Sequence, residues 1–255
     1  MKNVLIVTYY WPPASGPGVW RFLKFSKYLP QFGWNPIIIT IKDGAYPSVD
    51  KTLLDDITES IEVHATNSFE PYRIYNALQG KKGKSIPEAM AGIRESKSIF
   101  QRFSKYIRAN YFVPDPKIGW IPYAVREGVK IINSTKIDAI ITTGPPSSTH
   151  LIGLSLKEQF NIPWMMDFRD PWSSNYFNTE FLNRSARANK KDKELEDRAL
   201  SKVDVAIGIS NGILEEYADR AKRVETVYNG YDELDFKESL DKKSEIFRLS
   251  YIGSL

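Results

Sequence analysis

The strongest constraint on the fold is a repeated order of short apolar segment, loop and helical segment, which starts near the N-terminus. Val4–Thr8 is apolar and rich in β-branched residues, as in a strand buried on both faces. A loop rich in proline and glycine follows, and Val19–Leu29 then carries apolar residues at helical spacing, with Gly33 in the C-cap position. Ile37–Ile41 is a second apolar run. A strand, a helix and a strand in this order predict a βαβ unit with a parallel sheet.

The same pattern continues towards the C-terminus, and in total it gives about seven candidate strands. The further strands are expected at Ile61–Ala65, Ile137–Thr142, Pro163–Asp167, Val203–Ile209 and Arg223–Tyr228. Helices are expected around Ile121–Ile132, Ser148–Phe160, Glu180–Ser201 and from Gly212 to Tyr217. We therefore predict an α/β protein with a doubly wound, Rossmann-like parallel sheet over residues 1–231.

The last part of the chain does not continue this domain. Residues 232–246 are polar and charged without a strong period, which indicates a linker. Phe247–Ile252 then has the pattern of another first strand, followed by a Gly-Ser pair. Because one strand cannot form a domain, this segment either pairs with the first sheet or begins a second domain, and we interpret residues 247–255 as the first strand of a truncated second domain.

Composition excludes several classes of protein. The chain of 255 residues contains no cysteine, which rules out disulfides and thiolate metal sites and fits a reducing compartment. The net charge of +4 is too small to argue for nucleic acid as a partner. No apolar stretch approaches the roughly 18 residues of a membrane-spanning helix, and the apolar start is too short for a signal peptide. We therefore expect a cytoplasmic protein.

One segment has a strong local charge. Residues 81–108 hold eight Lys or Arg and two Glu, a local net charge of +6. The C-terminal part of this segment is expected to form a helix with an aromatic and aliphatic face. The basic side chains Lys97, Arg102, Lys105 and Arg108 lie mostly elsewhere on that helix. Such a helix either packs its apolar face on the domain or lies on an anionic membrane surface.

The first loop, PPASGPGVWR, is a candidate anion site. Gly16 and Gly18 stand at the start of the first helix, where backbone N–H groups and the helix dipole favour negative charge. The match to the dinucleotide fingerprint is partial, because Arg21 occupies the position of its third glycine. A guanidinium there can meet a phosphate or a carboxylate. The alternative is an ordinary Pro/Gly turn with a surface arginine.

Two further segments follow strands at their carboxyl ends, where α/β sheets bind ligands. TTGPPSSTH places His150 on the first turn of a helix, with Ser147 or Ser148 as the expected N-cap, and this histidine is either structural or catalytic. MMDFRDPW places Asp167, Arg169 and Asp170 at the next strand end, as a salt-bridged cluster or as a polar binding surface. We expect no metal site, since the two acids supply too few ligands.

The fourth segment is VYNGYD. Asn229 and Gly230 predict a turn between the last strand and the linker, and therefore a hinge between domains or an ordinary turn. Two other classes of protein remain open on the residues alone. One is a nicotinamide-dependent Rossmann enzyme, which Asp43 supports and Arg21 opposes. The other is a non-catalytic binding module.

Together these segments resemble glycosyltransferase family 4, whose members are retaining enzymes with the two-domain GT-B fold. The first strand and Gly-rich loop (residues 4–21) and the stretch GPPSSTHLIGLSLKEQFNIPWMMDFRDPW (residues 144–172) carry the likeness, the latter to envelope-polysaccharide members. VYNGYD is similar to the signature at the domain junction, and FRLSYIGSL to the first strand of the C-terminal domain.

The resemblance implies a hexosyl-type transferase that moves a sugar from a nucleotide-sugar to a glycan or lipid-linked acceptor, with no metal and no other cofactor. It places Gly16 and Gly18 near the donor diphosphate, His150 beside the transferred sugar, and Arg169 and Asp170 on the acceptor side. This chain would be the N-terminal, acceptor-side half, inactive alone. A lipid-linked acceptor would explain a basic helix at the inner face of the membrane.

Overall fold

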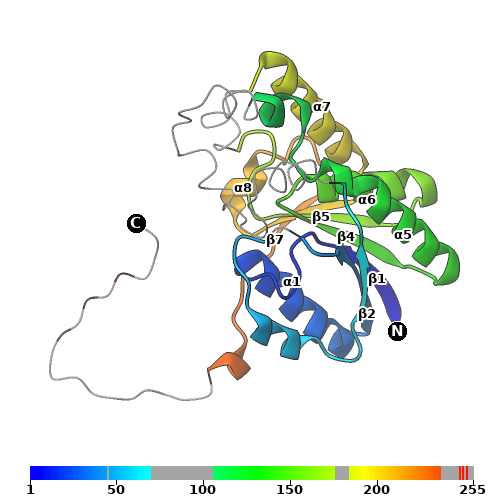
Figure 1. Ribbon diagram of the computed structural model, residues 1–255, viewed down its shortest axis with the longest axis vertical. Coiled ribbons are helices and arrows are strands. Elements are labelled where there is room, and N and C mark those ends of the chain that lie inside the picture. Colours follow the sequence, from blue (N-terminus) through cyan, green and yellow to red (C-terminus); the bar gives the residue numbers. More distant parts are fainter. Residues whose placement is uncertain are drawn as a thin grey trace, which may run out of the picture.

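A computed structural model describes residues 1–44, 46–69, 106–175 and 184–236, together with Phe247, Leu249 and Tyr251. In these ranges seven parallel strands form one sheet in the order β3-β2-β1-β4-β5-β6-β7 (Figure 1). The strands are β1 (Lys2–Val7), β2 (Trp34–Ile41), β3 (Glu62–Thr66), β4 (Ala139–Gly144), β5 (Trp164–Phe168), β6 (Val205–Gly208) and β7 (Val224–Thr226). The predicted doubly wound, Rossmann-like class is confirmed.

Helices cover both faces of this sheet. In the described ranges they include α1 (Pro17–Tyr28), α5 (Ile121–Ser134), α6 (Ser148–Phe160), α7 (Ala186–Lys202) and α8 (Asn211–Glu215), with 3-10 turns η1 (Leu29–Phe32), η2 (Lys51–Asp56), η3 (Ile118–Trp120) and η5 (Glu233–Asp235). In Figure 1, α1 lies on one side of the sheet and α5, α6 and α7 lie on the other.

The apolar run of β1 is explained by these two layers. Val4 and Ile6 pack with Phe22 of α1, whereas Leu5 and Val7 point into the larger core under α5 and α6. Both faces of the strand are therefore buried, so every position selects an apolar side chain.

Some boundaries differ from the predicted ones. The first helix begins at Pro17, two residues before the expected start, because the fixed φ of proline suits the first helical position. Gly33 does close this segment, with φ 79°, but after the helix has tightened into η1. The predicted start of the 180–201 helix lies outside the described residues, and α7 begins after Ser185, whose hydroxyl caps Ala188 N–H. Most of the predicted strand at 247–252 also lies outside them.

The strand order creates one topological switch point. The chain runs from β1 outwards to β2 and β3, and it then returns to place β4 on the other side of β1. The loops after β1 and β4 therefore diverge to opposite faces and leave a crevice at the carboxyl ends of the two strands. The segments singled out in the sequence follow β1, β4, β5 and β7 at this same edge.

Candidate anion site at the carboxyl edge

The loop after β1 is held firmly at its far side. Ala14 pairs with Val49 in an antiparallel bridge, and Ser15 N–H donates to the carbonyl of Ser48 at 3.0 Å. The loop ends at Gly16, which has φ 131° and ψ 168°. Only glycine adopts this conformation without strain, so Gly16 fixes the direction in which the chain enters α1.

The N-terminus of α1 lies against the guanidinium of Arg169. The first turn of α1 has no side-chain cap and no acidic residue. A Cβ on Gly18 would lie 1.1 Å from Nη1 of Arg169, so the absence of a side chain at Gly18 creates the space for that group. The positive end of the helix dipole and a cation thus meet at one point, which favours an anion there.

Arg169 is held in place by the loop after β4. Its Nε donates to the carbonyl of Gly144 at 2.9 Å, and its Nη2 donates to the carbonyl of Pro145 at 2.5 Å. Burial lowers the pKa of Arg169 below its ordinary value, and the nearby carboxylates of Asp167 and Asp170 offset only part of this effect. Asp170 itself is exposed at the edge of the site. Gly18 and Arg169 are therefore in contact, and Asp170 follows Arg169 at the exposed edge of the site.

His150 lies beside the same loop but inside the protein. His150 is only 1% exposed. Burial, together with the charge of Arg169, lowers the pKa of its imidazole to about 3. The imidazole is therefore neutral at physiological pH. A Cβ on Gly144 would lie 2.6 Å from its Nε2, so that nitrogen lies next to the backbone at the end of β4.

The tautomer of His150 follows from its partners. Thr142 Oγ1 lies 2.8 Å from Nδ1 of His150 and accepts a hydrogen bond from Trp164 Nε1 at 3.0 Å. The single hydroxyl proton of Thr142 can then be donated to Nδ1. This arrangement pairs Trp164 Nε1, Thr142 Oγ1 and His150 Nδ1, and it leaves the imidazole proton on Nε2, beside Gly144.

Aromatic rings and buried acids build the wall behind His150. Its ring centre lies 5.0 Å from that of Phe168 and 5.7 Å from that of Trp172. The indole Nε1 of Trp172 donates to Asp192 at 2.8 Å, and the next residue, Ser173, donates from its N–H and its hydroxyl to Glu196. Both acids are buried on α7. The sequence analysis missed this pair, although its i, i+4 spacing places both side chains on one helix face.

Arg21 is not a surface residue and does not lie open to a ligand. Its side chain is 1% exposed and forms an ion pair with Asp167 at 2.8 Å. Of the two partners considered from the sequence, a phosphate and a carboxylate, the structure supplies a carboxylate. The other oxygen of Asp167 accepts from Thr143 Oγ1 at 2.8 Å. Asp167 therefore pairs with Arg21 of α1, although Arg169 is only two residues away in the sequence.

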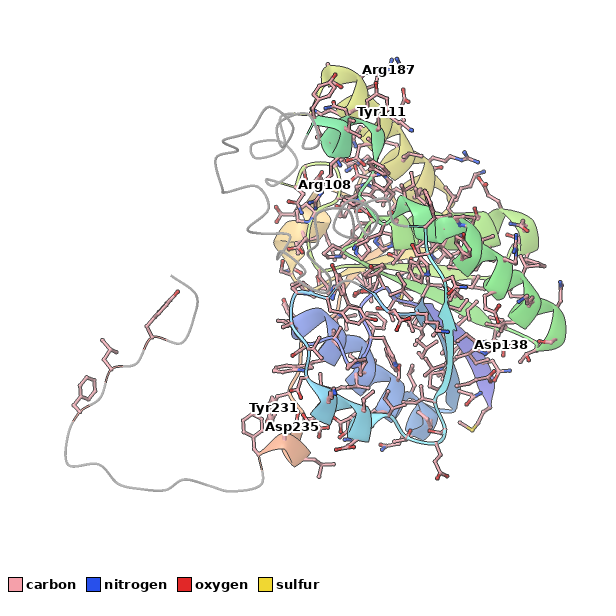
Figure 2. The ribbon with its side chains drawn as sticks, in the orientation of Figure 1. Arg108, Tyr111, Asp138, Arg187, Tyr231 and Asp235 are labelled. Carbon is pink, nitrogen blue, oxygen red and sulfur yellow. The ribbon has the colours of Figure 1, made fainter. Side chains whose placement is uncertain are left out.

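The Asn229–Gly230 turn is attached to α1 rather than free. Asn229 Oδ1 accepts from Arg21 at 3.0 Å. Asp232, at the start of the predicted linker, accepts from the hydroxyl of Tyr28 at 2.7 Å and from Lys24 and Lys27 at 3.0 and 3.1 Å. Figure 2 labels Tyr231 and Asp235 on this part of the chain, beside η5. Gly230 is exposed, and a Cβ there would meet no atom within 4 Å.

A serine, Ser147, does occupy the N-cap position of α6, as expected, but its side chain does not cap the helix. Instead Asp115, 33 residues earlier, accepts from the N–H and the hydroxyl of Ser148 at 2.7 and 2.8 Å. A carboxylate at the positive end of a helix does the same work as a local cap and adds a charge. The N-terminus of α6 is therefore already occupied by an anion.

Of the basic side chains proposed to face a membrane, Lys97, Arg102 and Lys105 lie outside the described residues. Arg108 is half-buried in the helical residues 106–111 (Figure 2). No helix in the described ranges combines the length and apolar character needed to cross a bilayer. Within those ranges no three His, Cys, Asp or Glu side chains are grouped as metal ligands.

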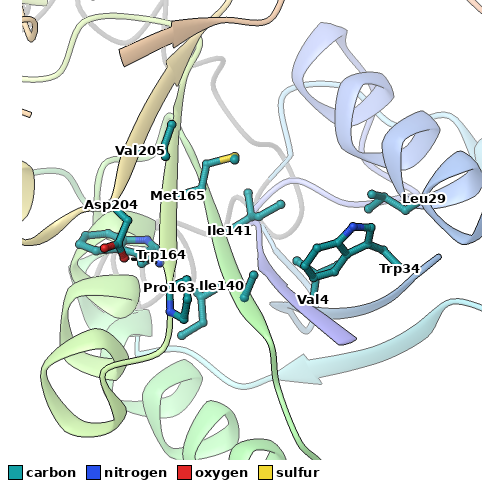
Figure 3. A pocket seen from close by; sticks show the side chains of 11 residues that line it. Val4, Leu29, Trp34, Ile140, Ile141, Pro163, Trp164, Met165, Asp204 and Val205 are labelled. Carbon is teal, nitrogen blue, oxygen red and sulfur yellow. Dashed lines mark hydrogen bonds between the residues drawn. The ribbon is translucent and has the colours of Figure 1, made fainter. Parts of the chain in front are cut away.

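An apolar pocket of about 310 Å³ lies away from this site. It is found at the amino ends of the strands, between Val4, Trp34 and Trp164 (Figure 3). Its walls are almost entirely apolar, whereas the polar residues described above gather at the carboxyl ends. We therefore place the candidate site at the carboxyl edge and not in the pocket.

Comparison with known proteins supports the fold. No model of a known protein family matches the sequence, and no curated protein sequence is significantly similar. Among solved structures, Anabaena Alr3699/HepE in complex with UDP-glucose has a TM-score of 0.53 at 15% identity, over 94% of this chain and 47% of that one. Apo UGT2 of Phytolacca americana has a TM-score of 0.51 at 11% identity, over 96% and 56%.

A UDP-glucosyltransferase of Polygonum tinctorium, described as capable of glucosylating indoxyl, has a TM-score of 0.50 at 12% identity, over 95% of this chain and 55% of that one. The chain therefore spans about half the length of the solved structures that it matches. At these identities the likeness establishes the fold alone. It is that of one Rossmann-like half of the GT-B architecture found in glycosyltransferases.

Proposed function

We propose that this chain is the N-terminal, acceptor-side half of a retaining glycosyltransferase of the family 4 type. The whole protein transfers a hexosyl-type sugar from a nucleotide-sugar to a glycan or lipid-linked acceptor, for a cell-envelope polysaccharide, without metal or other cofactor. In this proposal residues 1–231 form the acceptor domain, and residues 247–255 begin the donor-binding domain. The protein works in the cytoplasm, against the inner face of the membrane.

The observation that carries the proposal is the meeting of Arg169 with the uncapped start of α1 at Gly18. A guanidinium and a helix N-terminus together suit the diphosphate of a nucleotide-sugar. The similar Anabaena protein is named in complex with UDP-glucose, which supports a donor of this class. A nicotinamide-dependent enzyme is less well supported, because Arg21 fills the third-glycine position and is committed to Asp167.

His150 acts in this proposal as a neutral hydrogen-bonding group. Its low pKa argues against a charged or general-base role at neutral pH. Its Nε2 proton lies beside Gly144 and can be donated to a sugar hydroxyl. Because the ring is buried, contact with a sugar requires that the Gly144–Pro146 loop or Trp172 moves aside.

Backbone NMR of the 255-residue chain during titration with uridine diphosphate and with inorganic pyrophosphate tests the anion site. We expect shifts at Gly16, Gly18, Gly144 and Arg169, and their loss in Arg169→Met. Arg198→Met, which removes an exposed arginine on α7, is the matched control and should keep the shifts. Shifts confined to other residues, or none at millimolar ligand, contradict the site. Rapid transfer of sugar by this chain alone contradicts its assignment as an incomplete half.

A further inference from the structure

One buried guanidinium connects three separate segments of the domain. Nε and Nη2 of Arg21 donate to Asp167 Oδ1 at 3.1 and 2.8 Å. Its Nη1 donates to the carbonyl of Tyr228 at 3.2 Å and to Asn229 Oδ1 at 3.0 Å. With the bond from Thr143 to Asp167, an unbroken series of contacts runs from the turn after β7 to the end of β4.

Both ends of this series have a clear place in the fold. Thr143 directly precedes Gly144, whose carbonyl accepts a hydrogen bond from Arg169. Asp167 lies on β5, two residues before Arg169. Asn229 belongs to the turn through which the chain leaves β7. Arg21 therefore lies between the turn and the two strand ends that present the anion site.

We propose that Arg21 is a positioning residue that couples the Asn229–Gly230 turn to the loops carrying Gly144 and Arg169. The inference rests on the proposed function only in treating those loops as a ligand site. When the turn shifts, the Nη1 contacts break, and the guanidinium is free to rotate against Asp167. Asp167 then changes its hold on Thr143, and the ends of β4 and β5 loosen together.

The chemistry of arginine suits this role. A planar guanidinium holds two partners on different edges at once, and it keeps its charge when buried. A lysine at position 21 would offer a single point charge, and from one side of the cluster it could not hold Asp167 and the turn with the same geometry. A purely structural arginine would instead support the whole domain evenly.

Hydrogen exchange followed by mass spectrometry distinguishes these roles without any ligand. Asn229→Ala removes the part-buried contact of Arg21 Nη1 with Asn229 and leaves the ion pair with Asp167 intact. We expect exchange to quicken several-fold at the turn and also at the amides of Thr143, Gly144 and Arg169. The matched control is Asn211→Ala, an exposed asparagine that contacts Thr226 and has no link to Arg21; it should leave those three amides unchanged.

A double variant tests whether the effect of the turn on the strand ends passes through Arg21. With Arg21→Lys present, Asn229→Ala should add no further change at the strand ends, because the connection is already cut. The coupling is overturned if the effect of Asn229→Ala stays within residues 227–231, if Asn211→Ala gives the same increase, or if the two changes add fully. Should Arg21→Lys unfold the domain, the comparison of the two asparagine variants still decides.

A ligand measurement separates this inference from the proposed function. Asn229→Ala should weaken the binding of uridine diphosphate several-fold, although Asn229 does not line the anion site. Failure of the unchanged chain to bind uridine diphosphate contradicts the proposed function and leaves the exchange result standing. Binding that is identical in Asn229→Ala and the unchanged chain, with unchanged exchange, overturns the coupling alone.

Discussion

The guanidinium of Arg169 occupies the volume that a side chain on Gly18 would fill: a Cβ there would lie 1.1 Å from Nη1. Gly18→Ala must therefore displace Arg169 from the start of α1. The displaced group is the far end of a flexible side chain, and alanine favours the helix by up to about 1 kcal/mol over glycine. We expect Tm to change little, whereas the affinity for uridine diphosphate should fall about 10- to 100-fold, the worth of a hydrogen bond to a charged group.

Calorimetric titration and thermal unfolding of the same samples check this prediction. Gly212→Ala is the control, since a Cβ there meets no atom within 4 Å and Gly212 lies in α8, away from Arg169. Unchanged affinity in Gly18→Ala would remove Arg169 from the anion site.

A second prediction concerns the charge of His150. Its pKa in the folded protein is lowered to about 3 from an ordinary value of 6.5, mainly by burial. Below pH 6.5 the unfolded chain therefore binds a proton that the folded chain rejects, and stability falls as pH decreases from about 6.5 towards 3. In a His64→Gln background, which leaves a single histidine, ring NMR signals should not titrate between pH 5 and 8. A midpoint near 6.5 would refute the buried, neutral state.

The sequence predicts the sheet and the edge that carries the site, but it does not predict the partners of the charged residues. Apolar β-branched runs such as Ile37–Ile41 identify strands, and every candidate motif that follows a strand must meet the others at the carboxyl edge of a parallel sheet. Pairing is a different matter. Asp167 has Arg169 two residues away, yet it bonds to Arg21, 146 residues earlier in the chain. Local spacing holds no information about such contacts.

Capping shows the same limit. The pair Ser147–Ser148 satisfies every local rule for a helix start, and only the tertiary structure brings Asp115 to that position. On α7 the acids Asp192, Glu194, Glu196 and Asp197 are similar as sequence. The tertiary structure decides which of them are buried. Asp192 and Glu196 are buried because they bond to Trp172 and Ser173, which lie in the loop after β5.

Glu196 gives a third prediction. Its side chain is fully buried and binds the N–H and hydroxyl of Ser173 as well as Arg220 at 2.7 Å. Burial alone would raise its pKa, but Arg220 and Ser173 outweigh that effect and lower it. Glu196→Gln should lose about 1–3 kcal/mol in urea unfolding, because Arg220 loses its buried counter-charge. The effect should shrink as pH falls below 4.5, where Glu196 of the unfolded chain takes up a proton, and it should disappear once pH is also below the lower pKa of the folded state.

Glu194→Gln is the control for this change. Glu194 is 64% exposed and lies 3.9 Å from Lys190, a pair of the kind that contributes at most about 0.5 kcal/mol. Equal losses in the two variants would show that burial of Glu196 does not hold the loop after β5.

The final prediction concerns the anchor of the turn after β7. Burial is the largest single influence on Asp232 and would raise its pKa, but Tyr28, Lys24, Leu234 N–H and Lys27 together lower it well below its ordinary range. The carboxylate therefore stabilises the folded state fully above pH 4, and this contribution is lost as pH falls through the ordinary range of an aspartate and below. Asp232→Asn should expose residues 228–236 to faster hydrogen exchange at pH 7, and raising the salt concentration should weaken the same anchor only partly, because the carboxylate is buried. Asp235→Asn offers a matched comparison, since Asp235 also bonds to Lys24 but is 53% exposed. If both variants release the turn equally, the anchor is a diffuse surface attraction and not the buried contact of Asp232 with α1.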